Sequence, residues 1–76
     1  MLKRLIPIIR EVFDDEDFEP TLETRPSEVE TWDSLSNIRL FLAVEKAFSF
    51  RFDTAEIGSV ENVGEFVDRV LAKRAS

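Results

Sequence analysis

The residues of this chain that could do chemistry lie in one short run, Thr31-Trp32-Asp33-Ser34-Leu35, between an acidic stretch and a long apolar segment. Aspartate is a preferred N-cap residue, so Asp33 predicts a helix that begins at Ser34. A hydroxyl there would lie at the positive end of the helix dipole, where an attached phosphate is favoured. Ser34 is a poor catalytic nucleophile, because the chain has no histidine to act as its base and no cysteine to replace it. We therefore interpret Ser34 as an attachment point for a group that would carry out any acyl chemistry.

Size and composition limit the classes of protein to consider. The 76 residues, 43% hydrophobic and 34% charged, predict a single small globular domain over residues 1–76, without room for an enclosed active site. The lack of cysteine excludes a disulfide framework and thiolate metal sites. No apolar run approaches the length of a membrane span and nothing resembles a signal peptide. We expect a monomeric cytoplasmic protein that does not insert into membranes.

The negative charge of the chain is concentrated before Ser34. The formal net charge of -6 argues against nucleic acid as a partner, because its phosphates would be repelled. Residues 14–33 contain nine carboxylates and one arginine, a net charge of -8. The run of Asp14, Asp15, Glu16 and Asp17 lacks the spaced oxygen ligands and the turn glycine of a calcium loop. We interpret it as solvated charge and predict no dedicated metal site, although weak and delocalised cation binding stays open.

Apolar periodicity predicts three main helices and a minor one. The first ends near residue 13 and begins close to Pro7, because proline is tolerated only in the first turn. The second runs from residue 34 to about residue 49. The last begins at residue 63, where Asn62 and Glu65 match a capping box. A short helix over residues 54–57, ended by Gly58, completes an all-α bundle of four helices.

The connection between the first two helices is long and contains Pro20 and Pro26. Structureless connections of this length are uncommon in compact domains, so this one should be held by its own apolar side chains. We expect four of them to pack beneath the helices, namely Phe18, Leu22, Val29 and Trp32.

The second predicted helix carries two apolar surfaces. One broad arc suits the core and contains Leu40, Phe41, Val44, Ala47 and Phe48. A separate stripe of Leu35, Ile38 and Leu42 lies near Ser34. In a monomer, a stripe of exposed aliphatic side chains indicates a surface that binds partners. The alternative is a helix at the centre of a bundle that buries both faces.

Together these features resemble an acyl carrier protein. The resemblance lies in Trp32-Asp33-Ser34-Leu35, in the helix ending Val44-Glu45-Lys46-Ala47-Phe48, and in Asn62-Val63 at the start of the last helix. It implies a four-helix acyl-carrier bundle whose Ser34 receives 4'-phosphopantetheine from coenzyme A, through a phosphopantetheinyl transferase that uses Mg2+. The arm would hold acyl intermediates as thioesters for loading and processing enzymes. The protein itself would then be a carrier and not an enzyme.

The resemblance also implies roles for the residues around Ser34. Asp33 matches the acidic residue that helps the transferase dock, and Leu35, Ile38 and Leu42 match exposed apolar positions of the family's recognition helix. From the apolar pattern itself, Ile57 and Phe52 are expected to hold the short helix to the core. We assign the partner-binding surface to eight residues: Leu35, Ile38, Arg39, Leu42, Glu45, Lys46, Glu56 and Ile57.

Two departures from the family pattern bear on the pathway. Trp32 replaces the usual small residue before the aspartate and is interpreted as a large plug for the loop. Arg39 and Lys46 lie on a helix that in the family is rich in carboxylates. This favours a specialised lipid, polyketide, peptide or surface-glycan pathway over primary fatty-acid synthesis. Two alternatives stay open: an aminoacyl or peptidyl carrier, and a carrier-like partner-binding protein without a prosthetic group, in which Ser34 only serves the helix start.

Overall fold

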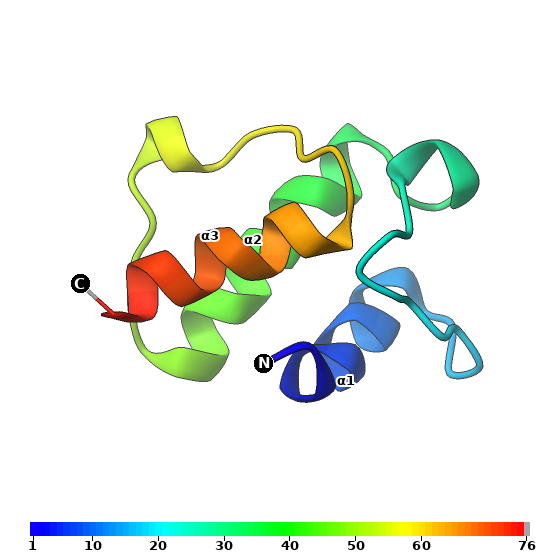
Figure 1. The fold of residues 1–76 in the computed structure, drawn as a ribbon, viewed down its shortest axis with the longest axis horizontal. Coiled ribbons are helices and arrows are strands. Elements are labelled where there is room, and N and C mark those ends of the chain that lie inside the picture. The colour runs from blue at the N-terminus through cyan, green and yellow to red at the C-terminus, as the bar shows by residue number, and fades with distance from the viewer. Residues whose placement is uncertain (76) are drawn as a thin grey trace.

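Three α-helices form the framework of the chain (Figure 1). The computed structural model describes residues 1–75, in which α1 spans Leu2–Phe13, α2 spans Ser34–Phe48 and α3 spans Val63–Ala75. Single 3-10 turns lie at Pro26–Glu28 and Thr54–Glu56, and the described residues contain no strand. The prediction of an all-α fold is confirmed.

The segment expected to be a short third helix is a single 3-10 turn, so the predicted four-helix bundle has three α-helices. Glu56 stabilises this turn with two hydrogen bonds to the backbone of Asp53. Its backbone N–H donates to the Asp53 carbonyl at 2.8 Å, and its carboxylate accepts the Asp53 N–H at 2.6 Å. Ile57 then adopts an extended backbone, with φ -87° and ψ 104°, which prevents a second turn.

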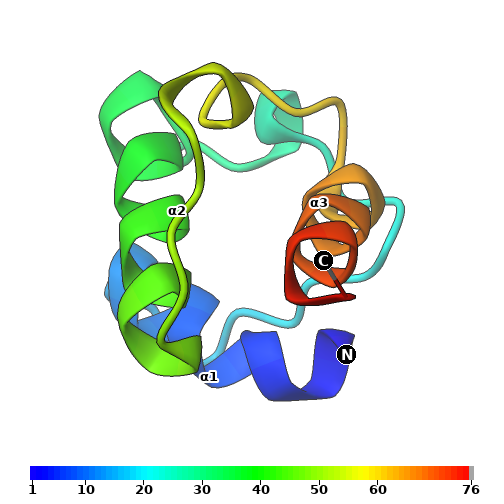
Figure 2. The same cartoon turned by 90° about the vertical axis from the view of Figure 1, so that its left-hand side faces the viewer.

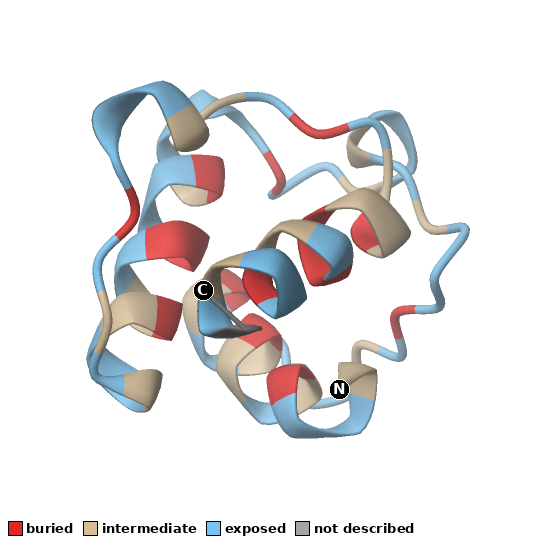
Figure 3. Ribbon diagram, turned by 60° about the vertical axis from the view of Figure 1, so that its left-hand side comes forward, coloured by how far each residue is buried: buried red, intermediate tan, exposed pale blue. Residues whose placement is uncertain are grey.

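The helices enclose one apolar core. α2 and α3 lie on opposite sides with α1 below them, and the segment that leaves α2 crosses over the top to reach α3 (Figure 2). The buried residues of each helix face inward (Figure 3). The Phe41 ring makes edge contacts with Phe52 and Phe66, both at 5.0 Å between ring centroids. On α2 the predicted core arc is confirmed for Leu40, Phe41 and Val44, whereas Phe48 is half-buried and Ala47 is exposed.

The prediction that α1 begins close to Pro7 is wrong, because the helix begins at Leu2 and Pro7 lies inside it. Leu5, Ile9 and Phe13 are all buried and are spaced four residues apart, so one apolar stripe continues past the proline. α1 packs this stripe against the bundle, and its contact with α2 is extensive. We infer that this packing offsets the hydrogen bond that Pro7 cannot donate.

The connection over residues 14–33 is held partly as predicted. Trp32 is buried, and Phe18 and Val29 are half-buried against the core. Leu22, in contrast, is exposed, so the prediction for its side chain is wrong. The backbone attaches this part of the connection instead, because the Leu22 carbonyl accepts the Gly64 N–H at 2.8 Å. The free N–H groups at the start of α3 provide this attachment.

Asn62 caps α3 as predicted, since its side-chain oxygen accepts the Glu65 N–H at 2.8 Å. The second half of the predicted capping box differs. The Glu65 carboxylate accepts the N–H of Glu61 at 3.1 Å, one residue before the expected donor.

Candidate functional site

Ser34 is the first residue of α2 and its side chain is exposed. Asp33 precedes it in an extended conformation and caps the helix, with its carboxylate oxygen Oδ1 accepting the Ser36 N–H at 2.9 Å. This backbone hydrogen bond is the main reason that the pKa of Asp33 lies below its ordinary value. The prediction of an aspartate-capped helix beginning at Ser34 is therefore confirmed. Two adjacent residues thus supply a hydroxyl and a carboxylate at the exposed start of α2.

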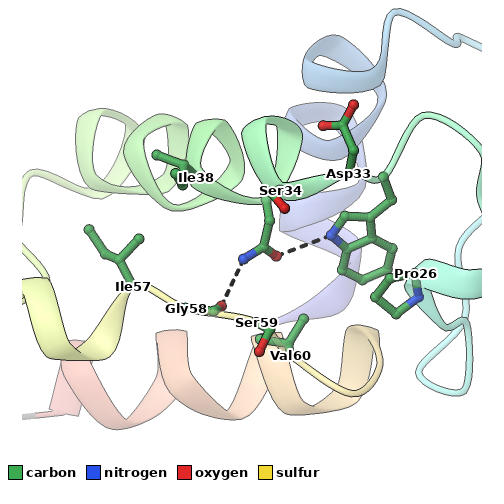
Figure 4. Close-up of a pocket in the computed structure, with 10 residues that line it drawn as sticks. Pro26, Asp33, Ser34, Ile38, Ile57, Gly58, Ser59 and Val60 are labelled. Carbon is green, nitrogen blue, oxygen red and sulfur yellow. Dashed lines mark hydrogen bonds between the residues drawn. The ribbon is translucent and has the colours of Figure 1, made fainter.

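An open pocket of about 480 Å³ adjoins Ser34. One side is formed by Ser34 and Ile38 of α2, and the opposite side by the segment from Ile57 to Val60 (Figure 4). Pro26 and Trp32 belong to its wall on the side of the long connection. Residues from three separate parts of the chain thus surround the space next to the Ser34 hydroxyl.

Two hydrogen bonds join these three parts through Asn37. The Trp32 indole Nε1 donates to Asn37 Oδ1 at 3.1 Å, and Asn37 Nδ2 donates to the Gly58 carbonyl at 2.7 Å; Figure 4 marks both bonds with dashed lines. Asn37 is 8% exposed, the one buried polar side chain in the part of the chain that the structure describes. A buried amide of this kind requires partners, which Trp32 and Gly58 supply.

Sequence reasoning interpreted Trp32 only as a plug and assigned no role to Asn37. The available signal was the position of Asn37, which precedes the buried Leu40 and Phe41 by three and four residues and so lies on the same face of α2. A polar side chain on a core-facing arc indicates a specific buried partner.

The far wall of the pocket is fixed by Arg69 of α3, a second residue that sequence reasoning missed. Its guanidinium donates to the carbonyls of Glu56 and Gly58, both at 3.4 Å, and of Ser59 at 3.2 Å. An ion pair with Glu65 at 2.6 Å orients the guanidinium. The planar, many-donor guanidinium suits several carbonyls at once.

The predicted apolar stripe on α2 is exposed. Leu35, Ile38 and Leu42 have exposed fractions of 57%, 44% and 50%. The alternative that α2 buries both of its faces is therefore excluded for these three residues. Because Ile38 also lines the pocket, the stripe continues from the pocket along α2.

The other residues assigned to partner binding differ in their surroundings. Arg39 and Lys46 are exposed on α2. Glu45 is half-buried, and its carboxylate accepts the Phe52 N–H at 2.6 Å.

The two predicted partner-binding residues outside α2 are Glu56 and Ile57. The Glu56 carboxylate forms an ion pair with Lys73 at 3.0 Å and accepts the Asp53 N–H, and this backbone hydrogen bond is the main cause of the lowered pKa of Glu56. Ile57 is half-buried, lines the pocket and packs against the core. Their roles toward partners stay predictions.

Chemically, the site offers an accessible hydroxyl without a base of its own. The chain contains no histidine and no cysteine, so nothing near Ser34 forms a nucleophile and base pair of the usual kind. Among residues 1–75, no group of three or more acidic side chains converges to hold a metal ion. Across the same residues, no helix combines the length and the apolar character needed to cross a membrane.

Comparisons with known proteins give one strong similarity. The fold matches the solution NMR structure of a holo acyl carrier protein from Geobacter metallireducens with a TM-score of 0.84 and 38% sequence identity. The match covers 97% of this chain and 85% of that one. No protein-family model matches the chain, and no curated protein matches it either. The similarity extends over nearly the whole chain and is not confined to the residues around Ser34.

Proposed function

Because the chain belongs to the acyl carrier protein family, we propose that it carries acyl groups on a 4'-phosphopantetheine arm attached to Ser34. The observation that carries this proposal is the exposed Ser34 hydroxyl at the start of α2, beside an open pocket. As a carrier it is not itself a catalyst. We propose that residues 1–76 act as one carrier domain.

The residues around Ser34 fit such a group. A phosphate ester on the first residue of a 15-residue helix lies at the positive end of the helix dipole. When attached, the arm supplies the thiol that this cysteine-free chain lacks, and acyl cargo is held on it as a thioester. Asp33 keeps a negative charge next to Ser34, because its hydrogen bond to Ser36 favours the ionised form. We assign to it the docking of the transferase.

Intact-mass measurement tests the attachment. Incubation of the chain with coenzyme A, Mg2+ and a broad-specificity phosphopantetheinyl transferase should add one phosphopantetheine group, and Ser34→Ala should abolish the addition. Ser36→Ala is the matched control, because Ser36 lies in the same first turn of α2 but is half-buried. A folded chain that gains no mass would instead favour a carrier-like binding protein without a prosthetic group, and a gain at Ser36 or Ser49 would refute the assignment of Ser34.

The proposed role of Asp33 in docking the transferase can be tested separately from its role as the N-cap of α2. Asp33→Asn retains a side-chain oxygen that can cap α2 but removes the negative charge. If the charge docks the transferase, this variant should be modified more slowly while its melting temperature changes little. Asp33→Ala should lose both the charge and the cap, so its modification should be slower and its melting temperature lower by several degrees. Unchanged modification of Asp33→Asn would show that the transferase does not need the negative charge.

The surface of α2 supports a specialised set of partner enzymes. Arg39 and Lys46 are exposed beside the apolar stripe, whereas the carboxylate of Glu45 is engaged by the Phe52 N–H. Like charges across an interface disfavour binding, so enzymes that approach with a basic surface would be repelled. We propose that the protein serves a dedicated lipid, polyketide, peptide or surface-glycan pathway and not primary fatty-acid synthesis.

Charge reversal tests this choice of partner. Enzymes of primary fatty-acid synthesis should use the modified protein poorly, and the double variant Arg39→Glu, Lys46→Glu should improve its use through faster association at low salt. Ile38→Asp should impair dedicated partners, because it interrupts the apolar stripe. Efficient use of the unaltered protein by the primary enzymes would refute the proposed specialisation.

A further inference from the structure

A second hollow lies between α1 and α2 and is referred to here as the α1–α2 groove. Its volume is about 600 Å³. Its apolar lining comes from Ile8 and Val12 of α1 and from Ala43 and Ala47 of α2. It shares no lining residue with the pocket beside Ser34. The groove is therefore a separate part of the surface, on a different side of α2 from that pocket.

The charge in the groove is mostly positive. Arg39 and Lys46 line it from α2, and Glu11 lines it from α1; all three residues are exposed. Among residues 1–75, neither Arg39 nor Lys46 forms an ion pair. Lys46 also lines a neighbouring hollow together with Arg51, which is exposed as well. The groove thus presents two cations against one carboxylate, and the positive charge continues past the end of α2.

Most other basic side chains of the chain already have a partner. Six of them are engaged, because Arg25, Arg69 and Lys73 form ion pairs, Arg10 donates to the Phe18 carbonyl, and Arg4 and Arg74 lie over the Phe48 ring. Arg39 and Lys46 differ from these six in that their charge is available to a second molecule.

The negative net charge of the chain does not describe this surface. Residues 14–22, the first part of the acidic connection, lie on one side of the molecule, and the C-terminal end of α2 lies on the opposite side (Figure 1). Near 0.1 M salt the Debye length is about 10 Å, so a charged group in the groove interacts mainly with the cations beside it. An acidic ligand can therefore bind there although the chain as a whole carries a charge of -6.

We propose that the α1–α2 groove binds an acidic helical segment of a partner protein, whose carboxylates pair with Arg39 and Lys46 and whose apolar side chains enter the groove. The two cations are seven residues apart, about 10.5 Å along α2. Residues i, i+3, i+4 and i+7 of a helix share one face, so a partner helix can carry carboxylates at that spacing with apolar side chains between them. This binding would need neither Ser34 nor the arm and so goes beyond the proposed carrier function.

The test uses the full, unmodified, isotope-labelled chain and two synthetic helical peptides. The first peptide has Glu at positions i and i+7 and Leu at i+3 and i+4, and the second has Lys in place of both Glu residues. In a titration near 0.1 M salt, the Glu peptide should shift the amide NMR signals of Val12, Ala43 and Ala47 but not that of Ser59. The Lys peptide should bind much more weakly, because the groove would repel it.

Charge variants show whether the groove itself is responsible. Lys46→Glu should weaken binding of the Glu peptide by about fivefold or more, because an attraction becomes a repulsion. Glu11→Gln should strengthen it, because a like charge is removed. Lys3→Glu is the matched control and should change little, since Lys3 lies on the side of α1 opposite to Val12. Equal weakening by Lys46→Glu and Lys3→Glu would overturn the proposal, because only the net charge would then matter.

A neutral variant tests the hollow separately from its charges. Ala47 is exposed and lines the groove, so Ala47→Trp should fill the groove and abolish most of the binding. Ala72→Trp is the control on the exposed surface of α3 and should bind the Glu peptide normally. Circular dichroism verifies that both variants fold. Normal binding by Ala47→Trp would overturn the proposal, because the ligand would then not enter the groove.

Other occupants of the groove would also overturn the proposal. Vesicles of phosphatidylcholine and phosphatidylserine that shift the groove signals, when the Glu peptide does not, would assign the surface to a membrane. A dimer in sedimentation that Lys46→Glu dissociates would assign it to a second copy of this chain. Absence of any binding by the Glu peptide would refute it outright. None of these results concerns Ser34, whose modification is measured by mass, so the proposed function would stand.

Discussion

The two irregular connections beside Ser34 both bury apolar side chains, but polar side chains bond to the backbone of the second at more places. The connection over residues 14–33 relies on the buried Trp32 and on backbone carbonyls that bond to the start of α3. Its ion pair between Arg25 and Glu61 is largely exposed. The connection over residues 49–62 also buries apolar side chains, Phe52 and Val60, and charged side chains bond to its backbone in addition, with Arg69 donating to three carbonyls and Glu45 accepting the Phe52 N–H.

This difference shows how an acidic connection and a well-defined pocket wall coexist in a small protein. Burial of an aromatic side chain does not depend on the charge of its neighbours, so Trp32 can anchor a connection with a net charge of -8. Hydrogen bonds are directional, so Asn37 and Arg69 can fix the Gly58 and Ser59 carbonyls of the opposite pocket wall. Loss of the Trp32 side chain should therefore lower the overall stability most. Loss of the Arg69 guanidinium should mainly loosen the pocket wall.

The largest expected effect is that of Trp32→Ala. Truncation of a buried Trp typically costs about 3–5 kcal/mol of unfolding free energy, through lost burial and the cavity that remains. It would also leave Asn37 Oδ1 without its donor. Urea unfolding followed by circular dichroism measures the loss. Trp32→Phe is the control and should lose clearly less, because most of the ring is retained; equal losses would show that the hydrogen bond, and not burial, anchors this connection.

Arg69→Met should have an intermediate effect on the second connection. Hydrogen bonds to a charged donor contribute about 1.5–3 kcal/mol, so we expect a loss of that order or less for this half-exposed side chain. Hydrogen exchange should accelerate at the Glu56 and Ile57 amides, which bond within the 3-10 turn. Arg25→Met is the matched control and should cost under about 1 kcal/mol, as exposed ion pairs do. Equal effects of the two variants would contradict the comparison.

Acid should weaken one carboxylate contact beside each connection. The pKa values of Asp33 and Glu56 are lowered in the folded state, chiefly by backbone hydrogen bonds to Ser36 and Asp53. Their stabilising contribution is therefore complete above the ordinary carboxylate pKa of about 4 and is lost as the pH falls through the lower folded values. Lys73, with a raised pKa caused mainly by Glu56, loses its contribution only as the pH rises above about 10.4.

Melting curves between neutral pH and about pH 3 measure this dependence. Asp33→Asn and Glu56→Gln each remove one titrating group, so each should make the melting temperature fall less steeply with acid. A slope that neither substitution changes would show that other carboxylates cause the acid sensitivity.

The smallest expected effect is that of salt on the acidic connection. Repulsion among its nine carboxylates is screened once the Debye length falls to about 10 Å, near 0.1 M salt. The melting temperature should rise with salt, and rise further with Mg2+ if the run over residues 14–17 gathers cations. The paired variant Asp15→Asn, Asp17→Asn should reduce this rise. A melting temperature indifferent to salt would show that these charges do not destabilise the connection.

Prediction from sequence succeeded where the required contacts are local. The start of α2 depends on Asp33 and an N–H three residues later, and the cap of α3 depends on Asn62 in the same way. It failed at Pro7, because the local rule for proline does not include the packing of Leu5 and Ile9 on either side. It also failed at Leu22, where the backbone carbonyl and not the side chain makes the attachment.

The sequence by itself determined the all-α class, the exposed Ser34 with its capping aspartate, and the apolar stripe beside it, because helical periodicity and capping involve residues within one or two turns. Only the tertiary structure decided how the pocket next to Ser34 is closed. Asn37 donates a hydrogen bond to the Gly58 carbonyl, 21 residues away in the sequence, and the Arg69 guanidinium donates to the Ser59 carbonyl, 10 residues away. Such pairs are formed by the packing of the helices, and no local pattern specifies which carbonyl a distant side chain will reach.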